Sequence, residues 1–184
     1  MKQPRTIRRL ATAVILLAGL GASSAFGQFN STGTTTVSVT VGAEASIQID
    51  TGTTGLTSSG TLFSDYTGTT NYTYKVRTTK SGGTGTITLR VTSDFSPAGG
   101  PSVTTPPSGG DALTYTCTVV APASACSSQT SSTSASTAVA SFGADARSAK
   151  AGNAGNAVNW TLTNDPVYQT GSFNSTATFT ISAT

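Results

Sequence analysis

The side chains of this sequence that could do chemistry are mostly hydroxyls, and the groups that would activate them are scarce. Serine and threonine make up roughly a third of the 184 residues. The chain contains no histidine, so a serine or cysteine nucleophile activated by histidine is excluded. The common zinc hydrolase site is excluded for the same reason. The sequence also lacks a Gly-x-Ser-x-Gly elbow, a phosphate-binding glycine loop and a carboxylate cluster for calcium.

One carboxylate lies in a sequence context that suggests catalysis. Asp50-Thr51-Gly52 resembles the active-site triplet of aspartic proteases, whose mechanism needs two aspartates that share a proton. The chain holds one such triplet, so a second copy of the chain would have to supply the other. A turn that ends a strand, in which the Asp50 side chain accepts hydrogen bonds from its neighbours, is the simpler interpretation.

Two other groups have both a functional and a structural interpretation. Ser148 and Lys150 have the types of a serine–lysine pair, but Lys150 would have to be buried to lose its proton, and its Gly/Ala-rich surroundings predict an exposed loop. Trp160 and the tyrosines suggest a platform for stacking sugars, yet Trp160 shares its strand face with Val158 and Leu162, which favours the core. We therefore expect no enzyme, no cofactor and no metal site.

The two cysteines predict a disulfide. Cys117 and Cys126 lie close together in the chain with Pro122 between them, a spacing that can close a hairpin or a loop at the end of a strand. A metal site would need further cysteine or histidine ligands. A disulfide also fits an exported protein.

The first 27 residues have the organisation of a secretory signal peptide. An apolar run from Leu10 to Ala22 follows a basic start, and Ala25-Phe26-Gly27 is a small-x-small cleavage site. We expect cleavage after Gly27 or Ala25, no membrane span once the signal is removed, and a secreted or cell-surface protein, exported through the periplasm if the source has two membranes. A retained N-terminal anchor and twin-arginine export are the alternatives, the latter weakened by Ile7 before the arginine pair.

Removal of this segment changes the charge of the chain. Four of the ten basic residues lie in it and all seven acidic residues follow it, so the remainder carries six basic and seven acidic residues. The high isoelectric point therefore gives no reason to expect a nucleic-acid partner. The basic residues Lys75, Arg77 and Lys80 are interpreted as a solvated strand face.

The remaining residues, 28–184, predict one all-β domain. Apolar residues alternate with polar ones in several short stretches separated by Gly, Pro, Ser and Asn. About seven or eight such strands favour an antiparallel, immunoglobulin-like β-sandwich. A hairpin is expected where Tyr72–Val76 is joined to Ile87–Val91 by a glycine turn. The expected strands are 34–41, 45–49, 71–79, 86–92, 112–120, 138–143, 157–163 and 175–184, with loops at 96–110, 127–137 and 143–157.

The two ends of this domain resemble those of fimbrial subunits of the chaperone-usher and colonisation-factor type. At the C-terminus, Gly171 and Phe173 precede an alternating strand that carries Phe179 and Ile181, as in the last strand of such subunits. At the N-terminus, the stretch TTTVSVTV places Val37, Val39 and Val41 on one face and runs on toward the first strand of the domain.

This resemblance implies a structural or adhesive surface subunit in which the segment 28–41 supplies a strand to a neighbouring subunit. Its partners would be other copies of the chain or related surface subunits, together with a periplasmic chaperone. The same segment could instead pair within its own chain, and the two arrangements are left open here. A self-contained module that binds carbohydrate or matrix is the alternative function.

Overall fold

A computed structural model of the chain describes residues 32–184. Residues 32–39 belong to one compact unit of the chain and 40–184 to a second, which contains every strand of the described part. The predicted signal peptide and the first residues of the predicted donor segment lie outside the described residues. Across the described residues, no helix is long and apolar enough to cross a membrane.

Residues 40–184 form an all-β domain, as the sequence predicts. Seven of its strands have five or more residues and three have two. Every pairing between them is antiparallel. The strands are β1 (Glu44–Ile49), β2 (Thr57–Ser58), β3 (Tyr66–Arg77), β4 (Gly85–Ser96), β5 (Thr114–Thr118), β6 (Ser124–Ala125), β7 (Gln129–Thr130), β8 (Thr137–Phe142), β9 (Asn153–Leu162) and β10 (Asn174–Ala183).

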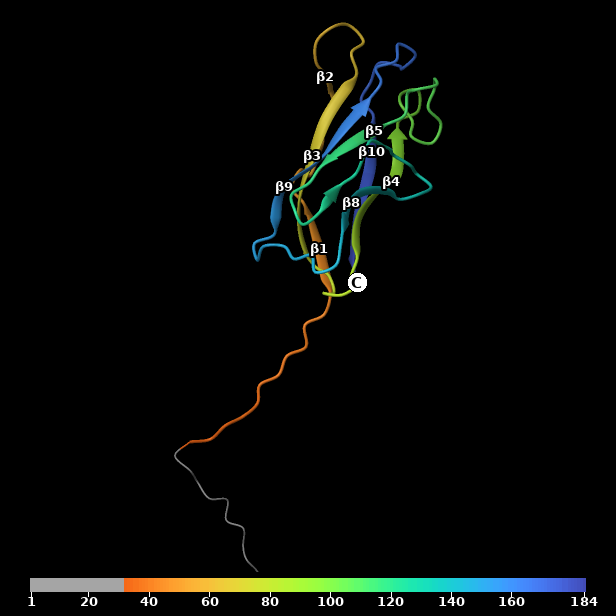
Figure 1. Ribbon diagram of the computed structural model, residues 1–184. Helices are drawn as coiled ribbons and strands as arrows, with labels where there is room; N and C mark the ends of the chain where they lie inside the picture. Colours follow the sequence, from red (N-terminus) through yellow and green to blue (C-terminus); the bar gives the residue numbers. More distant parts are fainter. Residues whose placement is uncertain (1–31) are drawn as a thin grey trace, which may run out of the picture. The chain divides into compact units, whose positions relative to one another are not determined.

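The strands build two sheets that form a sandwich (Figure 1). The six-stranded sheet has the order β1-β3-β9-β5-β7, with β2 paired to the start of β3. The four-stranded sheet has the order β10-β4-β8-β6. Within this domain β1 and β10 are therefore outermost strands of different sheets, and they lie next to each other on one side of the sandwich.

The predicted hairpin between 71–79 and 86–92 is wrong. Both strands exist, but β3 lies in the six-stranded sheet and β4 in the four-stranded sheet, so residues 78–84 carry the chain from one sheet to the other. The alternation that predicted the strands is equally satisfied by either arrangement, because it fixes which side chains face the core and not which strand is the partner. Tyr72, Tyr74 and Val76 of β3 therefore belong to the same core cluster as Ile87 and Leu89 of β4.

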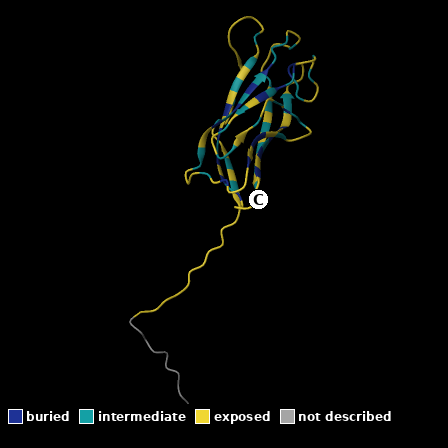
Figure 2. Ribbon diagram, viewed as in Figure 1, coloured by how far each residue is buried: buried dark blue, intermediate teal, exposed yellow. Residues whose placement is uncertain are grey.

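The core consists of the inward faces of the long central strands (Figure 2). Tyr72, Ile87, Leu89 and Val158 have no exposed surface at all. Trp160 is 6% exposed and donates its Nε1–H to Thr70 Oγ1 at 2.8 Å, so it is a core residue as its strand face predicts. An indole N–H needs such a partner when it is buried.

Two predicted loops contain strand residues. The stretch 127–137 includes β7, which pairs with β5. Ser131, which follows β7, is buried, and its hydroxyl donates a hydrogen bond to Leu113 O. The stretch 143–157 ends in the first residues of β9, where Asn156 is fully buried and bonds to the backbone of Tyr72 and Val120. Polar side chains that bond to neighbouring backbone replace the apolar pattern at these places, so periodicity alone missed them.

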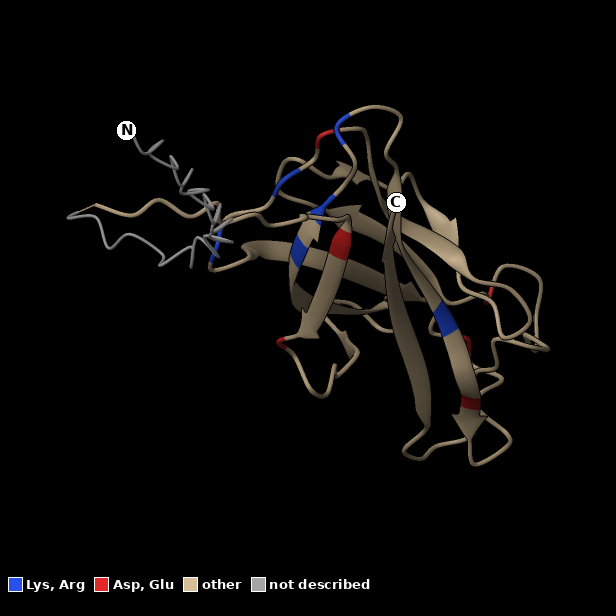
Figure 3. Ribbon diagram, turned by 90° about the horizontal axis from the view of Figure 1, so that it is seen from below, with Lys and Arg blue, Asp and Glu red and all other residues tan. Residues whose placement is uncertain are grey.

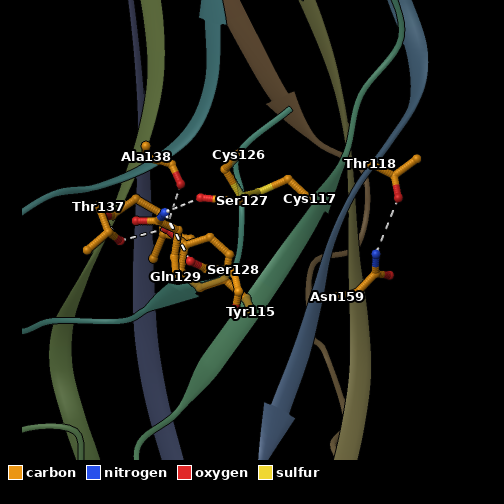
Figure 4. Close-up of a disulfide and its surroundings, with 11 residues drawn as sticks. Tyr115, Cys117, Thr118, Cys126, Ser127, Ser128, Gln129, Thr137, Ala138 and Asn159 are labelled. Atoms are coloured by element: carbon orange, nitrogen blue, oxygen red, sulfur yellow. Dashed lines mark hydrogen bonds between the residues drawn. A yellow bond between two sulfur atoms is a disulfide. The ribbon is translucent and has the colours of Figure 1, made fainter. Parts of the chain in front are cut away.

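The predicted disulfide is present and joins the two sheets (Figure 4). Cys117 lies on β5 of the six-stranded sheet, and Cys126 directly follows β6 of the four-stranded sheet. The Cys126 N–H donates to Val139 O at 3.0 Å, which attaches the second cysteine to β8. The bond therefore closes the short crossover between the sheets and not a hairpin within one sheet.

Removal of the disulfide should weaken the domain without unfolding it. The two cysteines are nine positions apart. For a loop of this length the chain-entropy relation gives a stabilisation of about 2 to 3 kcal/mol, and replacing both cysteines with serine should lower the free energy of unfolding by that amount. Urea unfolding of the double variant measures this loss, and the intact mass of the wild type should rise by two hydrogens on reduction. Free thiols in protein prepared without reductant would contradict the assignment.

Two core tyrosines allow a matched test of buried hydroxyls. The Tyr72 hydroxyl is buried without a hydrogen-bond partner. Its pKa is raised, mainly because of burial and to a smaller extent because of the neighbouring Tyr74. The Tyr115 hydroxyl lies 2.7 Å from Thr137 Oγ1 and 2.8 Å from Ala138 O. Removing an unpaired buried hydroxyl breaks no hydrogen bond and removes the free-energy cost of burying that group. Removing a paired hydroxyl leaves its hydrogen-bond partner unsatisfied.

We therefore expect Tyr72→Phe to leave the free energy of unfolding unchanged or raise it by about 1 kcal/mol, and Tyr115→Phe to lower it by about 1 to 2 kcal/mol. Parallel urea titrations of the two variants give the comparison. Equal losses in both would show that the Tyr72 hydroxyl has a partner in solution.

Candidate functional site: the β10 edge and the N-terminal segment

The outer edge of β10 is an open sheet edge. β10 pairs with β4 along its length, and its other side has no strand partner among residues 40–184. In an antiparallel ladder every second residue directs both its N–H and its C=O to one side, so a ten-residue edge strand presents a row of unpaired backbone groups. Such an edge is a template for pairing with another chain.

The core is incompletely covered beside this edge. No residue of β1 or β10 falls in the buried class, although their inward-facing side chains pack against the core. The corresponding positions of β3 and β4 are almost fully buried. These half-buried apolar side chains, which we call the seam, are Ala45 and Ile47 of β1 and Ala177, Phe179, Ile181 and Ala183 of β10.

The segment 34–41 does not form the strand that its alternation predicts. Residues 32–43 have no strand assignment, and Figure 2 colours them as exposed. Val37 is 91%, Val39 84% and Val41 61% exposed, which makes them three of the eight exposed large apolar residues of the described chain. The alternation predicts a buried apolar face here, but these three side chains are exposed in the described part of the chain.

The chain is fixed where this segment enters the domain. Arg77, the last residue of β3, donates from Nε to Gly42 O at 2.6 Å and from its terminal nitrogen to Glu44 Oε2 at 3.0 Å. Glu44 is the first residue of β1 and lies opposite Arg77 in the sheet. The side chains of this ion pair are largely solvent-exposed, so the contact orients the backbone at Gly42 and adds little stability.

The other residues predicted at the C-terminus form part of the same edge or support it. Phe179 and Ile181 face the seam from β10, and the Phe179 ring lies 6.1 Å from that of Tyr72. Gly171 and Phe173 precede β10, and the Phe173 ring packs so closely on Gly100 that a Cβ there would lie 2.5 Å from it. Phe173 thus anchors the start of β10 to the loop that follows β4.

The structure places the three sequence candidates for catalysis, Asp50, Ser148 and Lys150, as follows. Asp50 follows β1 and accepts hydrogen bonds from Thr73 Oγ1 at 2.8 Å and Gln48 Nε2 at 3.1 Å. The Ser148 hydroxyl accepts the Val76 N–H, and Lys150 is exposed. Among residues 32–184 no group of three or more acidic or cysteine side chains could hold a metal ion.

The loops between β4 and β5 and between β9 and β10 are held by carboxylates. Asp94 accepts three backbone N–H groups and the Ser102 hydroxyl; partial burial alone would raise its pKa, but these bonds outweigh it and lower the pKa to about 2. Asp111 is buried, and its pKa is raised, mainly by desolvation and to a smaller extent by the nearby Asp165. Bonds from Ser108 and Val167 lower that of Asp165.

The sequence predicted the C-terminal strand correctly, whereas the strand predicted at 34–41 is not formed within the described chain. The seam residues of β1 and the role of Arg77 follow from strand order, which alternation does not encode. Comparison with known proteins gave no matching family model, curated protein or solved structure.

The exposed valines should be irrelevant to the stability of the isolated chain. Replacing Val37, Val39 and Val41 with serine should change the free energy of unfolding by no more than about 0.5 kcal/mol. Val91→Ser, at a position that is 1% exposed on β4, is the control and should cost about 2 kcal/mol or more. Urea unfolding at low protein concentration tests both variants. A large drop in the free energy of unfolding of the triple variant would show that the valines pack against the domain of the same chain.

Proposed function

We propose that this chain is a secreted structural subunit, similar in assembly to fimbrial subunits, in which the segment 34–41 of one copy adds as a strand to the β10 edge of another. The observation that supports the proposal is the pairing of two incomplete features. One is a regular apolar face without a sheet, and the other is a sheet edge beside an incompletely covered core.

The dimensions and energies of the two features match. Eight residues in extended conformation span roughly 26 Å, and the ten residues of β10 roughly 33 Å, so the segment fits along most of the edge. Backbone hydrogen bonds would hold the added strand, and side-chain pockets would set its register. Burying three valines contributes about 5 to 8 kcal/mol before ordering costs are subtracted.

Pairing within one chain is the competing arrangement. Two residues, Gly42 and Ala43, separate the segment from β1, which is enough for a hairpin that extends the β1 edge. Such a turn needs a positive φ at Gly42, whereas the backbone there is not in that region and Arg77 holds its carbonyl. This favours donation to another copy.

The proposal includes the partners and location that assembly would require. An open ten-residue edge promotes uncontrolled pairing, so a periplasmic chaperone that covers β10 before export fits the geometry. A self-contained carbohydrate-binding module has less support, because Phe63 is the sole aromatic among the exposed large apolar residues of the described chain.

Deletion of residues 28–41 tests strand donation. The truncated chain should stay folded, aided by a chaperone or an added peptide, but should fail to form polymers in negative-stain microscopy and light scattering. A synthetic peptide TTTVSVTV should bind it, and the same peptide with serine for each valine should not. A full-length chain that stays monomeric at high concentration, with the amides of 34–41 protected from exchange, would refute the proposal.

A further inference from the structure

Two carboxyl groups from different connections meet at the end of the domain where β10 begins. Asp111 lies between β4 and β5, and Asp165 lies between β9 and β10. A side-chain hydrogen bond joins the two groups. Two carboxylates in such close contact cannot both be ionised, so one of them holds a proton that the other accepts. We call these two residues the carboxyl pair.

The proton of the carboxyl pair resides on Asp111. This residue is 2% exposed, and its pKa is raised, mainly by desolvation and to a smaller extent by the charge of Asp165. Asp165 is only partly buried. Its pKa is lowered by the Ser108 hydroxyl and by the Val167 N–H, which donates to Oδ1 at 2.8 Å. The protonated carboxyl of Asp111 therefore donates to the carboxylate of Asp165.

The loops around the carboxyl pair contain no basic residue. The segments 59–65, 97–113 and 163–173, which we call the acidic loops, include aspartates but no lysine or arginine. Five of the six basic residues of the described chain lie toward the opposite end, where β3 ends and β4 begins, and Figure 3 looks onto that end. The sixth, Arg90, lies in the middle of β4 and donates from Nε to Thr133 O at 2.9 Å. The pair is therefore held by its proton and not by a salt bridge.

The other titratable groups around the carboxyl pair add no positive charge. The Tyr168 hydroxyl is buried close to Asp111 without a well-aligned hydrogen bond to the described residues, and its pKa is raised to about 12, mainly by desolvation. Tyr66, at the start of β3, has a smaller effect on Tyr168. From the end of β4, Asp94 accepts bonds from the loop that leads to Asp111 and stays ionised above its pKa of about 2. The Tyr115 hydroxyl of β5 bonds to β8, and β9 and β10 contain no ionisable residue.

The carboxyl pair is part of a brace between two of the acidic loops. The Gln169 N–H donates to Gly99 O at 2.8 Å, and the Thr163 hydroxyl donates to Gly110 O at 3.2 Å. These bonds hold segment 163–173 against segment 97–113. Because segment 163–173 leads directly into β10, the brace fixes the approach of the chain to the open edge.

We propose that this brace is a pH-sensitive latch, in which the carboxyl pair holds the two loops together while its proton is bound and releases them when the proton is lost. The inference goes beyond strand donation and does not rest on it. Without the proton, two negative charges would face each other with Asp111 removed from water. Burying an unpaired charge is costly, so the loops separate and admit water. Neither aspartate belongs to the hydrophobic core cluster, so the loops can open while the core stays folded.

The pH range of the latch follows from the directions of the two pKa shifts. The pKa of Asp111 is raised, so its contribution to stability is complete below the ordinary value of 3.8 and is lost as the pH rises through the raised pKa. The pKa of Asp165 is lowered, so its contribution is present above 3.8 and is lost as the pH falls through the lowered pKa. The latch is therefore strongest near pH 3.8 and opens as the pH rises past the pKa of Asp111.

Opening of the latch affects the first residues of β10. Asn174 pairs with Ser96 and Thr176 with Ser93, and the register shifts between these pairs and again before Ala177. The start of β10 is therefore less regularly paired than the strand from Ala177 onward. Release of segment 163–173 adds to this irregularity, so a rise in pH loosens one end of the open edge and leaves the rest in place.

Amide hydrogen exchange of the full-length chain at low protein concentration tests the latch. After correction for the intrinsic effect of pH on exchange, the opening equilibrium of segment 163–173 should rise with pH, by about tenfold for each unit by which the pKa of Asp111 is raised. The core segments of β4 and β9 should show no such rise. Asp111→Asn should abolish it, because the amide stays neutral and can still donate to Asp165. Asp65→Asn is the matched control, since it removes an exposed carboxylate of the acidic loops and should behave as the wild type.

Carbon NMR of the aspartate carboxyl groups measures the pKa values directly. In the wild type the midpoint of Asp111 should lie above 3.8 and that of Asp165 below it, with the two titrations coupled. Asp165→Asn should lower the Asp111 midpoint, because it removes the neighbouring charge. The pH dependence of exchange in segment 163–173 should decrease correspondingly in this variant.

Three results would overturn the inference. They are corrected exchange in segment 163–173 that does not change with pH, a rise that persists in Asp111→Asn, and an Asp111 midpoint at or below 3.8. If Asp111→Asn does not fold, the wild-type titration and Asp165→Asn decide between the outcomes. None of these measurements involves polymerisation, so the latch can fail while strand donation holds, and strand donation can fail while the latch holds.

Discussion

The structure depends on one constraint: an apolar strand face has to be covered from the opposite sheet. Along the middle of the sandwich β3 and β9 supply one half of this cover and β4 and β8 the other, and their inward side chains are almost fully buried. The arrangement fails at the side where both sheets end together. β1 and β10 have no strand beyond them in the described chain, so their inward residues are half-covered from one direction and open from the other. The incompleteness is a consequence of strand order and not of poor packing.

The crossovers between the sheets explain why this side stays open. Residues 78–84 carry the chain from the second strand of one sheet, β3, to the second strand of the other, β4, and the first and last strands of the domain, β1 and β10, lie outside them at the edges. The disulfide closes the third crossover, from β5 to β6, at the opposite side of the sandwich. The covalent bond thus reinforces the connection between β5 and the four-stranded sheet, away from the β10 edge.

The sequence predicted much of this and failed at identifiable points. Alternation located β1, β3, β4, β5, β8, β9 and β10 because each has one apolar face, and it assigned Trp160 to the core correctly. It could not show that β3 and β4 belong to different sheets, since a hairpin and a crossover place Tyr72 and Leu89 in the same core. It also missed strand residues such as Asn156, whose buried amide satisfies backbone groups and has no apolar signature. The alternation of valines at 34–41 predicts a strand that is not formed in the described chain, because alternation does not show whether a partner strand is present.

The distribution of charge gives the open edge a direction. A free strand edge alone could accept an incoming segment in either orientation, because parallel pairing is only slightly less stable per residue than antiparallel pairing. In this chain the acidic loops surround the start of β10, while the basic residues surround its end and the entry of the donor segment at Gly42. Reversing the neighbour would bring like charges together at the contact, which disfavours that encounter before any strand has paired. In the proposed assembly, backbone hydrogen bonds and valine burial would supply affinity and the charges would favour one orientation, so the two properties would come from separate sets of residues.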